Sequence, residues 1–334
     1  MTGKAPRVRA SKGLECPIQL RSPSPLPDKR ELPSLLEPAL FHPRYWFTWL
    51  GVCLMWLLTR LPIRWQLAVG AGLGHLGYYL AGSRRHIVQV NFSLVFQKLN
   101  SDEQAELVRR TFRSTGMGLV ETAMAWFCDP RKLQPRVQVD GLEHLRGAAA
   151  EGRGVILMGM HFASLDLCGA VLGTYEDFSV MYRRSKNLLM ERVMSRGRIK
   201  NFPDAIQRDD VRNVVRALKA GDIVWYGPDQ DYGRKNAVFV PFMGVSAATI
   251  TGTSRLARLT GARVVPFTLA RTDDSGTYLI RLQPALSDFP SDSDEQDCRR
   301  INEIIETQVK QYPEQYWWMH RRFKTRPEGE ERPY

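Results

Sequence analysis

The sequence predicts an α/β protein with a mixed, largely parallel sheet flanked by helices, preceded by an N-terminal membrane-anchoring helix. Two observations predict the sheet: apolar runs of strand length recur from about residue 136 onward, and stretches of helical period lie between several of them. A third observation predicts the anchor, because residues 45–59 carry no charged side chain and contain three tryptophans, which suit a membrane interface.

Composition indicates the kind of partner. The chain has 334 residues, with 47 Lys and Arg against 35 Asp and Glu, so its net charge is +12. This surplus favours anionic partners, namely phospholipid headgroups, nucleic acid or an acidic protein, although an inert basic surface is also compatible with it. Because the cysteines show no CxxC spacing, we expect neither a disulfide framework nor a structural zinc site. They are Cys16, Cys53, Cys128, Cys168 and Cys298.

The first part of the chain divides into a polar arm and an apolar segment. Residues 1–40 are basic and proline-rich without an apolar period, which predicts a flexible arm. Residues 41–83 contain two uncharged runs, 45–59 and 65–83, which predict one or two membrane-anchoring helices. The first run reaches about 22 Å as a helix, short of a hydrocarbon core of about 30 Å. A half-embedded helix or a hairpin of both runs therefore fits better than a single span, and buried core helices are the alternative.

Residues 84–334 are expected to form the folded domain, with a helical lead-in over 84–130 and an α/β core over 136–334. In the lead-in, Ser101 and Gln104 have the spacing of a capping box, and the helix behind them is expected to run to about Phe127. We expect the strands of the core at Val155–Met160, Phe178–Tyr182, Ile223–Tyr226, Val264–Leu269 and Tyr278–Leu282.

One strand end carries the most informative pair of polar residues. His161 follows the apolar run Val155–Met160, and Asp166 falls in the first turns of the helix expected behind it. Open α/β sheets place reactive groups at this edge. The Asp166 carboxylate can then accept the Nδ1–H bond of His161 and leave Nε2 free as a general base. The alternative is a structural pair, because His and Asp occur at this spacing by chance.

Three further segments combine polar and aromatic residues. Asp229 follows the strand Ile223–Tyr226 in a Gly-Pro turn, where Asp is also common for local reasons. Arg183 follows the strand Phe178–Tyr182 and suits a phosphate, although a solvated basic surface is equally compatible. Residues 313–326 interleave aromatic side chains with cations, as lipid-headgroup or nucleic-acid sites do; for Trp317 and Trp318 helix packing is the alternative.

Taken in order, five stretches of the chain resemble the late acyltransferases of lipid A biosynthesis, the lauroyl and myristoyl transferase group of the lysophospholipid acyltransferase superfamily. The resemblance covers about Phe41 to Tyr334. The stretches that carry it are Phe41–Trp46, Gly116–Phe127, the segment His161–Asp166, Val224–Gly233 and Pro313–Gly329. Many members of the lauroyl branch have Glu at the position of Asp166, so this residue does not decide the branch.

The resemblance implies a glycerolipid acyltransferase-like fold and an O-acyltransferase whose donor is acyl-acyl carrier protein, carrying laurate or a similar chain. The acceptor it implies is a 3-hydroxyacyl hydroxyl of a phosphorylated lipid A precursor. His161 would be the general base and Asp166 its orienting partner, with Arg183 and Asp229 in substrate binding or catalytic support. It implies the inner membrane, with the catalytic domain facing the cytoplasm, and neither a metal, a cofactor nor a nucleic-acid partner.

Two other functions are compatible with parts of this pattern. An acyltransferase of the same superfamily that acts on a glycerophospholipid or another glycolipid would share the residues around His161. A non-catalytic membrane-bound protein that binds nucleic acid or lipid through its basic patches would bind in a salt-sensitive way, and its binding would not depend on His161.

Overall fold

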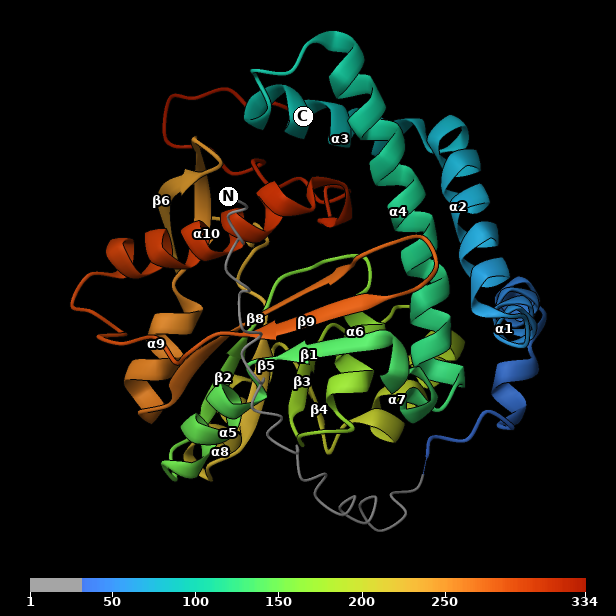
Figure 1. The fold of residues 1–334 in the computed structure, drawn as a ribbon, viewed down its shortest axis with the longest axis horizontal. Helices are drawn as coiled ribbons and strands as arrows, with labels where there is room; N and C mark the ends of the chain where they lie inside the picture. Colours follow the sequence, from blue (N-terminus) through green and yellow to red (C-terminus); the bar gives the residue numbers. More distant parts are fainter. Residues whose placement is uncertain (1–31) are drawn as a thin grey trace, which may run out of the picture.

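The computed structural model describes residues 32–334, and the predicted arm falls outside the described residues up to residue 31. A seven-stranded sheet forms the centre of the molecule, with strand order β1-β9-β8-β2-β5-β3-β4 (Figure 1). Its strands are β1 (Val137–Asp140), β2 (Val155–Met158), β3 (Ser179–Tyr182), β4 (Ala205–Gln207), β5 (Ile223–Tyr226), β8 (Arg263–Arg271) and β9 (Tyr278–Leu282). A separate antiparallel hairpin consists of β6 (Ala237–Phe242) and β7 (Val245–Ile250).

The pairing within the main sheet is parallel except between β8 and β9. All four residues of β2 are buried, as expected for a central strand covered on both faces. This arrangement confirms the predicted mixed, largely parallel sheet with flanking helices.

Helices precede the sheet and connect its strands. The α-helices are α1 (Trp46–Leu58), α2 (Ile63–Leu80), α3 (Gly82–Val95), α4 (Ser101–Phe127), α5 (Leu142–Ala150), α6 (Leu165–Leu172), α7 (Leu188–Asn201), α8 (Val211–Lys219), α9 (Gly252–Thr260) and α10 (Asp294–Gln311). Short 3-10 helices are η1 (Pro38–Phe41), η2 (Pro43–Tyr45), η3 (Pro130–Arg136) and η4 (Pro313–Gln315). Among these, α8 and α9 pack beside each other over β5, β2 and β8.

The N-cap of helix α4 lies one residue earlier than the sequence predicts. Asn100, not Ser101, is the N-cap: its side-chain oxygen accepts from the backbone N–H groups of Asp102 and Glu103, both at 3.0 Å. The Glu103 carboxylate in turn accepts from the Asn100 N–H at 2.8 Å. A capping box needs its partner three residues on, and both pairs satisfy that spacing, but the charged Glu103 completes the reciprocal bond. The helix ends at Phe127 as predicted.

A seam of glycines fastens α2 to α4. A Cβ added at Gly74 would lie 2.2 Å from the Phe112 carbonyl oxygen, and one at Gly116 would lie 2.2 Å from the Gly70 carbonyl oxygen. No other residue fits such a close approach of two helix backbones. The orientation of α2 is therefore fixed relative to α4, along whose outer side it runs in Figure 1.

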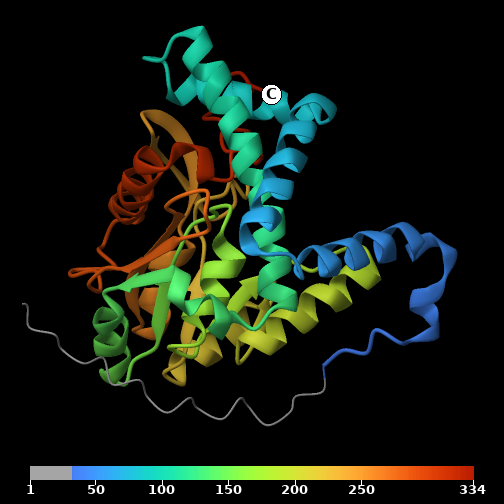
Figure 2. The ribbon, with the colours of Figure 1, turned by 45° about the vertical axis from the view of Figure 1, so that its right-hand side comes forward.

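The predicted anchor segment folds as the two helices α1 and α2, and both expose apolar side chains. Helix α1 packs on α7 through Val52, with Tyr45 of η2 in the same cluster, and extends outward from the α/β core in Figure 2. Phe47 is 88% exposed and Leu80 is 75% exposed. The other exposed apolar residues of this segment include Trp46, Leu50, Leu54, Trp56, Leu57, Trp65, Leu73, Leu76 and Tyr79.

Within residues 32–334, no helix combines the length and the apolar character that a membrane crossing requires. The predicted membrane anchor and transmembrane helix are thus not confirmed.

Candidate active site

His161 lies at the carboxyl edge of the sheet, where the sequence predicts it. Strand β2 ends at Met158, two more buried residues follow, and His161 turns the chain toward α6, which begins at Leu165. The side chain of His161 is 28% exposed, so its imidazole is reachable from solvent while most of the ring is enclosed. The edge of the ring faces Trp225, with the ring centroids 5.7 Å apart.

Asp229 is the carboxylate that holds His161. Strand β5 pairs with β2 in parallel register, with Met158 opposite Tyr226, so the turns that follow the two strands meet at the same edge. Asp229 Oδ1 lies 2.6 Å from His161 Nδ1, and Asp229 Oδ2 accepts from the His161 backbone N–H at 2.9 Å. Because a carboxylate accepts at Nδ1, the imidazole carries its proton there and Nε2 is left as the basic nitrogen. His161 Nε2 makes no hydrogen bond within the described residues 32–334.

The prediction that Asp166 bonds Nδ1 of His161 is wrong. Asp166 lies in the first turn of α6, and its carboxylate accepts from the Thr122 hydroxyl of α4 at 3.0 Å. Helix α6 begins only after His161 has turned away from β2, so the first helical turn points the carboxylate toward α4. Asp166 still acts on His161 through its charge, which contributes to the raised pKa of the imidazole.

Mutual attraction shifts the pKa values of His161 and Asp229 in opposite directions. Burial lowers the pKa of the His161 imidazole, but the charge of Asp229 and its hydrogen bond raise it by more, so the pKa lies above its ordinary value. Burial raises the pKa of the Asp229 carboxyl, and the charge of His161 with its two hydrogen bonds lowers it by more, so that pKa lies below its ordinary value. Asp229, only 1% exposed, therefore stays a carboxylate at neutral pH.

Two glycines make room for this arrangement. A Cβ at Gly227 would lie 3.0 Å from His161 Cε1 and 2.9 Å from Trp225 Cη2. A Cβ at Gly159 would lie 2.3 Å from Trp225 Nε1. The indole of Trp225 therefore sits between the two turns and supports the imidazole from one side.

His161 opens into a cavity of about 580 Å³ that has apolar walls and a cationic rim. Its apolar lining comes from β3, β5, β7, α8 and α9: Met181, Val211, Val214, Trp225, Ile250, Leu256 and Leu259. Its cations are Arg183, Arg208 and Arg255, against one carboxylate, Asp209. Such a cavity suits a ligand that has both a hydrocarbon portion and anionic groups.

The structure brings three of the four predicted site residues together. Arg183 lines the same cavity as His161, and Asp229 supports the imidazole from behind; Asp166 neither lines the cavity nor bonds the imidazole. Sequence reasoning missed Arg208 and Arg255. Arg208 follows β4, a strand of three residues that leaves no apolar run to detect, and Arg255 lies in α9 behind the hairpin.

Cys168 does not act as a nucleophile here. The thiol lies in α6 with no exposed surface, and burial raises its pKa far above the ordinary value, with the charge of Glu121 adding to the rise. Within residues 32–334 no group of three or more His, Cys, Asp or Glu side chains is arranged to hold a metal ion.

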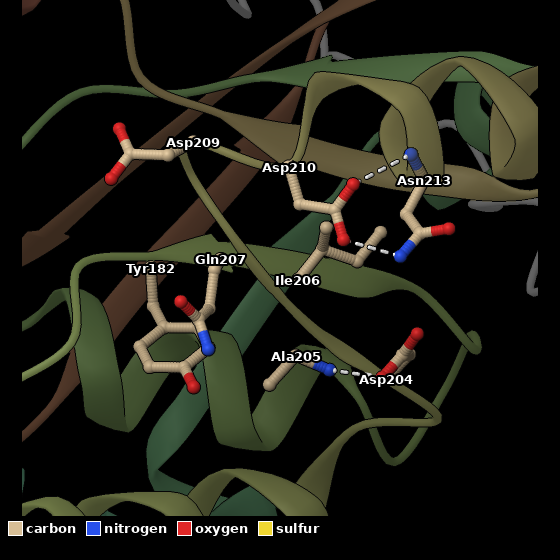
Figure 3. Close-up of a pocket in the computed structure, with 8 residues that line it drawn as sticks. All are labelled: Tyr182, Asp204, Ala205, Ile206, Gln207, Asp209, Asp210 and Asn213. Atoms are coloured by element: carbon tan, nitrogen blue, oxygen red, sulfur yellow. Dashed lines mark hydrogen bonds between the residues drawn. The ribbon is translucent and has the colours of Figure 1, made fainter.

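A second pocket, of about 450 Å³, lies beside the cavity and is acidic (Figure 3). Two of its carboxylates are already engaged in local structure. Asp210 caps α8 by accepting from the Asn213 N–H at 3.2 Å, and Asp204 accepts from the Ala205 N–H at 2.8 Å. Asp210 and Asp204 therefore stabilise the start of a helix and of a strand, and we assign no ligand to this pocket.

The fold and site define an α/β protein in which a histidine–carboxylate pair, set at the edge of a largely parallel sheet, faces an amphipathic cavity. The sequence model described as bacterial lipid A biosynthesis acyltransferase matches residues 36–325. The chain therefore belongs to this family of acyltransferases.

Relatives support the assignment. The chain is 41% identical to the lipid A biosynthesis lauroyltransferase of Escherichia coli (strain K12), over 87% of this chain and 95% of that protein. It is 40% identical to the palmitoleoyltransferase of the same strain, over 88% and 96%, and 29% identical to the myristoyltransferase, over 88% and 91%. A solved structure, that of the 1-acyl-sn-glycerophosphate (LPA) acyltransferase PlsC from Thermotoga maritima, aligns with 72% of this chain and 97% of its own chain. The TM-score is 0.36 and the sequence identity is 14%.

Proposed function

We propose that this protein transfers a fatty acyl chain, laurate or one of similar length, from acyl carrier protein onto a 3-hydroxyacyl hydroxyl of a phosphorylated lipid A precursor. The observation that carries the proposal is the His161–Asp229 pair at a cavity that joins apolar walls to three arginines. Family membership and the printed names of the relatives agree with an acceptor of this class.

The transfer begins with proton removal at His161. Nε2 takes the proton of the acceptor hydroxyl while its oxygen attacks the thioester carbonyl carbon, and Asp229 stabilises the imidazolium that forms. The tetrahedral intermediate then collapses by breaking the carbon–sulfur bond, and the imidazolium returns the proton to the departing thiolate of the carrier. The ester is formed, the carrier is released as a thiol, and His161 is neutral again.

The oxyanion of the intermediate needs donors that are free in the resting protein. The backbone N–H groups just after His161 are already engaged, because Phe162 N–H donates to the Met160 carbonyl at 3.2 Å and Ala163 N–H donates to the Gln315 carbonyl at 2.8 Å. Arg183, which lines the cavity with an exposed side chain, is a cation suited to the oxyanion or to an acceptor phosphate.

The cavity supplies separate surroundings for the two parts of the substrates. Val214 and Leu256, from α8 and α9, form an apolar wall suited to the acyl chain. Arg183 and Arg208 lie at the ends of β3 and β4, where they suit the phosphates of the acceptor. The net charge of +12 also favours encounter with an acidic carrier protein.

The exposed apolar residues of α1 and α2 support a location at the inner membrane, with the site facing the cytoplasm where a carrier protein delivers the donor. An apolar surface of this extent is uncommon on a monomer unless something covers it. Arg44 and Arg60 flank α1, Arg64 lies in the first turn of α2, and all three suit anionic headgroups. We expect no metal, cofactor or nucleic acid to take part in the reaction.

The experiment that tests the proposal offers the purified protein lauroyl-acyl carrier protein with two acceptors in parallel: a tetraacylated, phosphorylated lipid A precursor and lysophosphatidic acid. We expect mass spectrometry to show a gain of one lauroyl group on the lipid A precursor. A gain on lysophosphatidic acid alone would contradict the proposed acceptor and support a glycerophospholipid acyltransferase. Binding of both lipids without any mass gain would contradict the enzymatic function.

A further inference from the structure

The two turns that carry His161 and Asp229 extend beyond the sheet that brings them together. The paired residues of β2 and β5 end at Met158 and Tyr226, and one more bond follows, from the Gly159 N–H to the Tyr226 carbonyl at 3.0 Å. Beyond this point no backbone–backbone hydrogen bond joins the two segments within residues 32–334. The relative position of His161 and Asp229 therefore depends on something other than the sheet.

A segment far along the chain occupies this place. Residues 315–325, which we call the C-terminal strap, begin at the last residue of η4 and pass beside both turns. On the His161 side, the Trp317 N–H donates to the His161 carbonyl at 2.9 Å, and the Gln315 carbonyl accepts from Ala163. Tyr316 forms an isolated antiparallel bridge with Phe162, the residue next to His161.

The strap also holds the Asp229 turn. The Tyr316 hydroxyl donates to the Asp229 carbonyl at 2.9 Å. Two residues further on, Asp231 accepts from the Thr325 N–H at 2.8 Å and from the Thr325 hydroxyl at 2.9 Å, and its own N–H donates to His320 Nε2 at 3.0 Å. The turn from Asp229 to Asp231 is thus fixed at both of its ends by strap residues.

The strap itself is firmly anchored. Trp318 and Phe323 have no exposed surface, and Asn91 of α3 donates to the Trp318 carbonyl at 2.8 Å and to the His320 carbonyl at 3.0 Å. The buried guanidinium of Arg322 donates to the Ala248 carbonyl of β7 at 2.9 Å. A buried segment with this many bonds to two other elements is a rigid reference for the turns it contacts.

We propose that Tyr316 is a positioning residue for the acyl transfer: it bridges the two turns of the strap-held site and sets the distance between the Asp229 carboxylate and the His161 imidazole. Its hydroxyl bonds the Asp229 carbonyl, and its ring faces that of Phe162 at a centroid distance of 6.1 Å, while its chain neighbours Gln315 and Trp317 make the backbone bonds to the His161 turn. Its ring is buried against Trp318 and Phe242, so the hydroxyl cannot move independently of the strap.

This inference rests on the proposed function and concerns the same site. Without the Tyr316 hydroxyl, the buried Asp229 carbonyl loses its partner and the turn gains freedom to shift. The bond between Nδ1 and the carboxylate is then less well aligned, and the basicity of Nε2 falls with it. The acceptor and donor surfaces of the cavity are unaffected, because Tyr316 does not line it.

The test compares Tyr316→Phe with Tyr278→Phe. Both rings are buried and each change removes one hydroxyl donor, but the Tyr278 hydroxyl donates to Glu121 at 2.9 Å and makes no bond to a strap residue. In Tyr316→Phe we expect kcat for lauroyl transfer to fall about tenfold, with KM for either substrate changed less than about twofold. In Tyr278→Phe we expect kcat to remain that of the unmodified protein.

A second readout does not depend on turnover. The pKa of His161, followed by NMR of histidine-labelled protein with His161→Ala to assign the signal, should fall in Tyr316→Phe and stay constant in Tyr278→Phe. An unchanged titration of His161 in Tyr316→Phe overturns the inference whether or not transfer is observed. A chain that transfers no acyl group but shows the shift would contradict the proposed function and leave the positioning role standing.

Thr325 provides a variant that leaves the Tyr316 ring untouched. Thr325→Val removes the hydroxyl bond to Asp231 and keeps the backbone bond, so we expect a smaller fall in kcat, and Thr325→Ser should restore it. Equal losses in Thr325→Val and Thr325→Ser would point to a packing defect and overturn the role of the strap.

Discussion

Asp229 binds His161 at two points, because Oδ1 lies 2.6 Å from the imidazole Nδ1 and Oδ2 lies 2.9 Å from the backbone nitrogen. The carboxylate cannot rotate without breaking one of the two bonds. These two bonds fix both the tautomer and the orientation of the His161 imidazole, so Nε2 faces the cavity before any substrate binds. The geometry that the proposed mechanism requires is thus present in the resting protein.

The pH dependence of transfer follows from the charge of Asp229. The base acts only when Nε2 is unprotonated, so we expect kcat/KM to rise with pH through the pKa of His161, above its ordinary value of about 6.5. In Asp229→Asn the attraction is lost while burial of the ring remains. The acid limb should then move to lower pH, even though the maximum rate falls. A wild-type limb at or below the ordinary value would contradict the raised pKa.

Arg183 and Arg184 are adjacent in sequence and differ in position. Arg183 lines the cavity of His161, whereas Arg184 lines a separate, smaller pocket with Glu191 and Arg192. We expect Arg183→Ala to raise the KM for the phosphorylated acceptor roughly tenfold, because it removes a charge-assisted hydrogen bond. Arg184→Ala is the matched control and should leave that KM unchanged. Steady-state kinetics at varied acceptor decide the question, and equal KM values in both variants would remove Arg183 from the acceptor site.

The glycine seam predicts opposite effects of two identical changes in α2. A Cβ at Gly74 would lie 2.2 Å from the Phe112 carbonyl oxygen, while a Cβ at Gly72 meets no atom within 4 Å. Gly74→Ala should lower the free energy of unfolding by about 1–3 kcal/mol. Gly72→Ala should raise it by about 0.5–1 kcal/mol, because alanine loses less backbone entropy in a helix. Denaturant unfolding of both variants measures the difference; the same sign in both would argue against the tight α2–α4 contact.

Membrane contact through α1 and α2 predicts a local dependence on exposed apolar side chains. Replacing Phe47 and Trp65 together by Ser should reduce co-sedimentation with anionic phospholipid vesicles several-fold, since both rings are largely exposed. Leu259→Ser is the control, because Leu259 is also exposed but lies on α9, on the far side of the sheet from α2 in Figure 1. If Leu259→Ser reduces co-sedimentation as much as the double variant does, the proposed membrane face is wrong.

The sequence predicted those parts of the fold that long apolar runs encode. The runs Ile223–Tyr226 and Tyr278–Leu282 match β5 and β9 residue for residue. Strand β4 was not predicted, since it has only three residues, and β1 carries Gln138 and Asp140 in place of an apolar run. Such strands are defined by the neighbours they pair with, and a single sequence does not contain that information.

The candidate site shows the same division. The position of His161 follows from the strand before it, and the basic residue Arg183 follows from the strand before that residue. The partner of His161 could not be found in this way, because Asp166 and Asp229 both follow strand or turn signals and only the strand order distinguishes them. Because β5 lies directly beside β2, Asp229 reaches His161 although the two residues are 68 positions apart in the sequence. Asp166 is close to His161 in sequence, but the start of α6 turns its carboxylate toward Thr122.

The rate of lauroyl transfer to the tetraacylated lipid A precursor, compared among His161→Ala, Asp229→Asn and Asp166→Asn, tests the central claim most directly. General-base assistance predicts that His161→Ala and Asp229→Asn are each slower by about 10²–10⁴-fold, and that Asp166→Asn stays within about tenfold of the unmodified protein. Circular dichroism checks that all three are folded. An Asp166→Asn protein as slow as His161→Ala, beside an Asp229→Asn protein of full activity, would contradict the account.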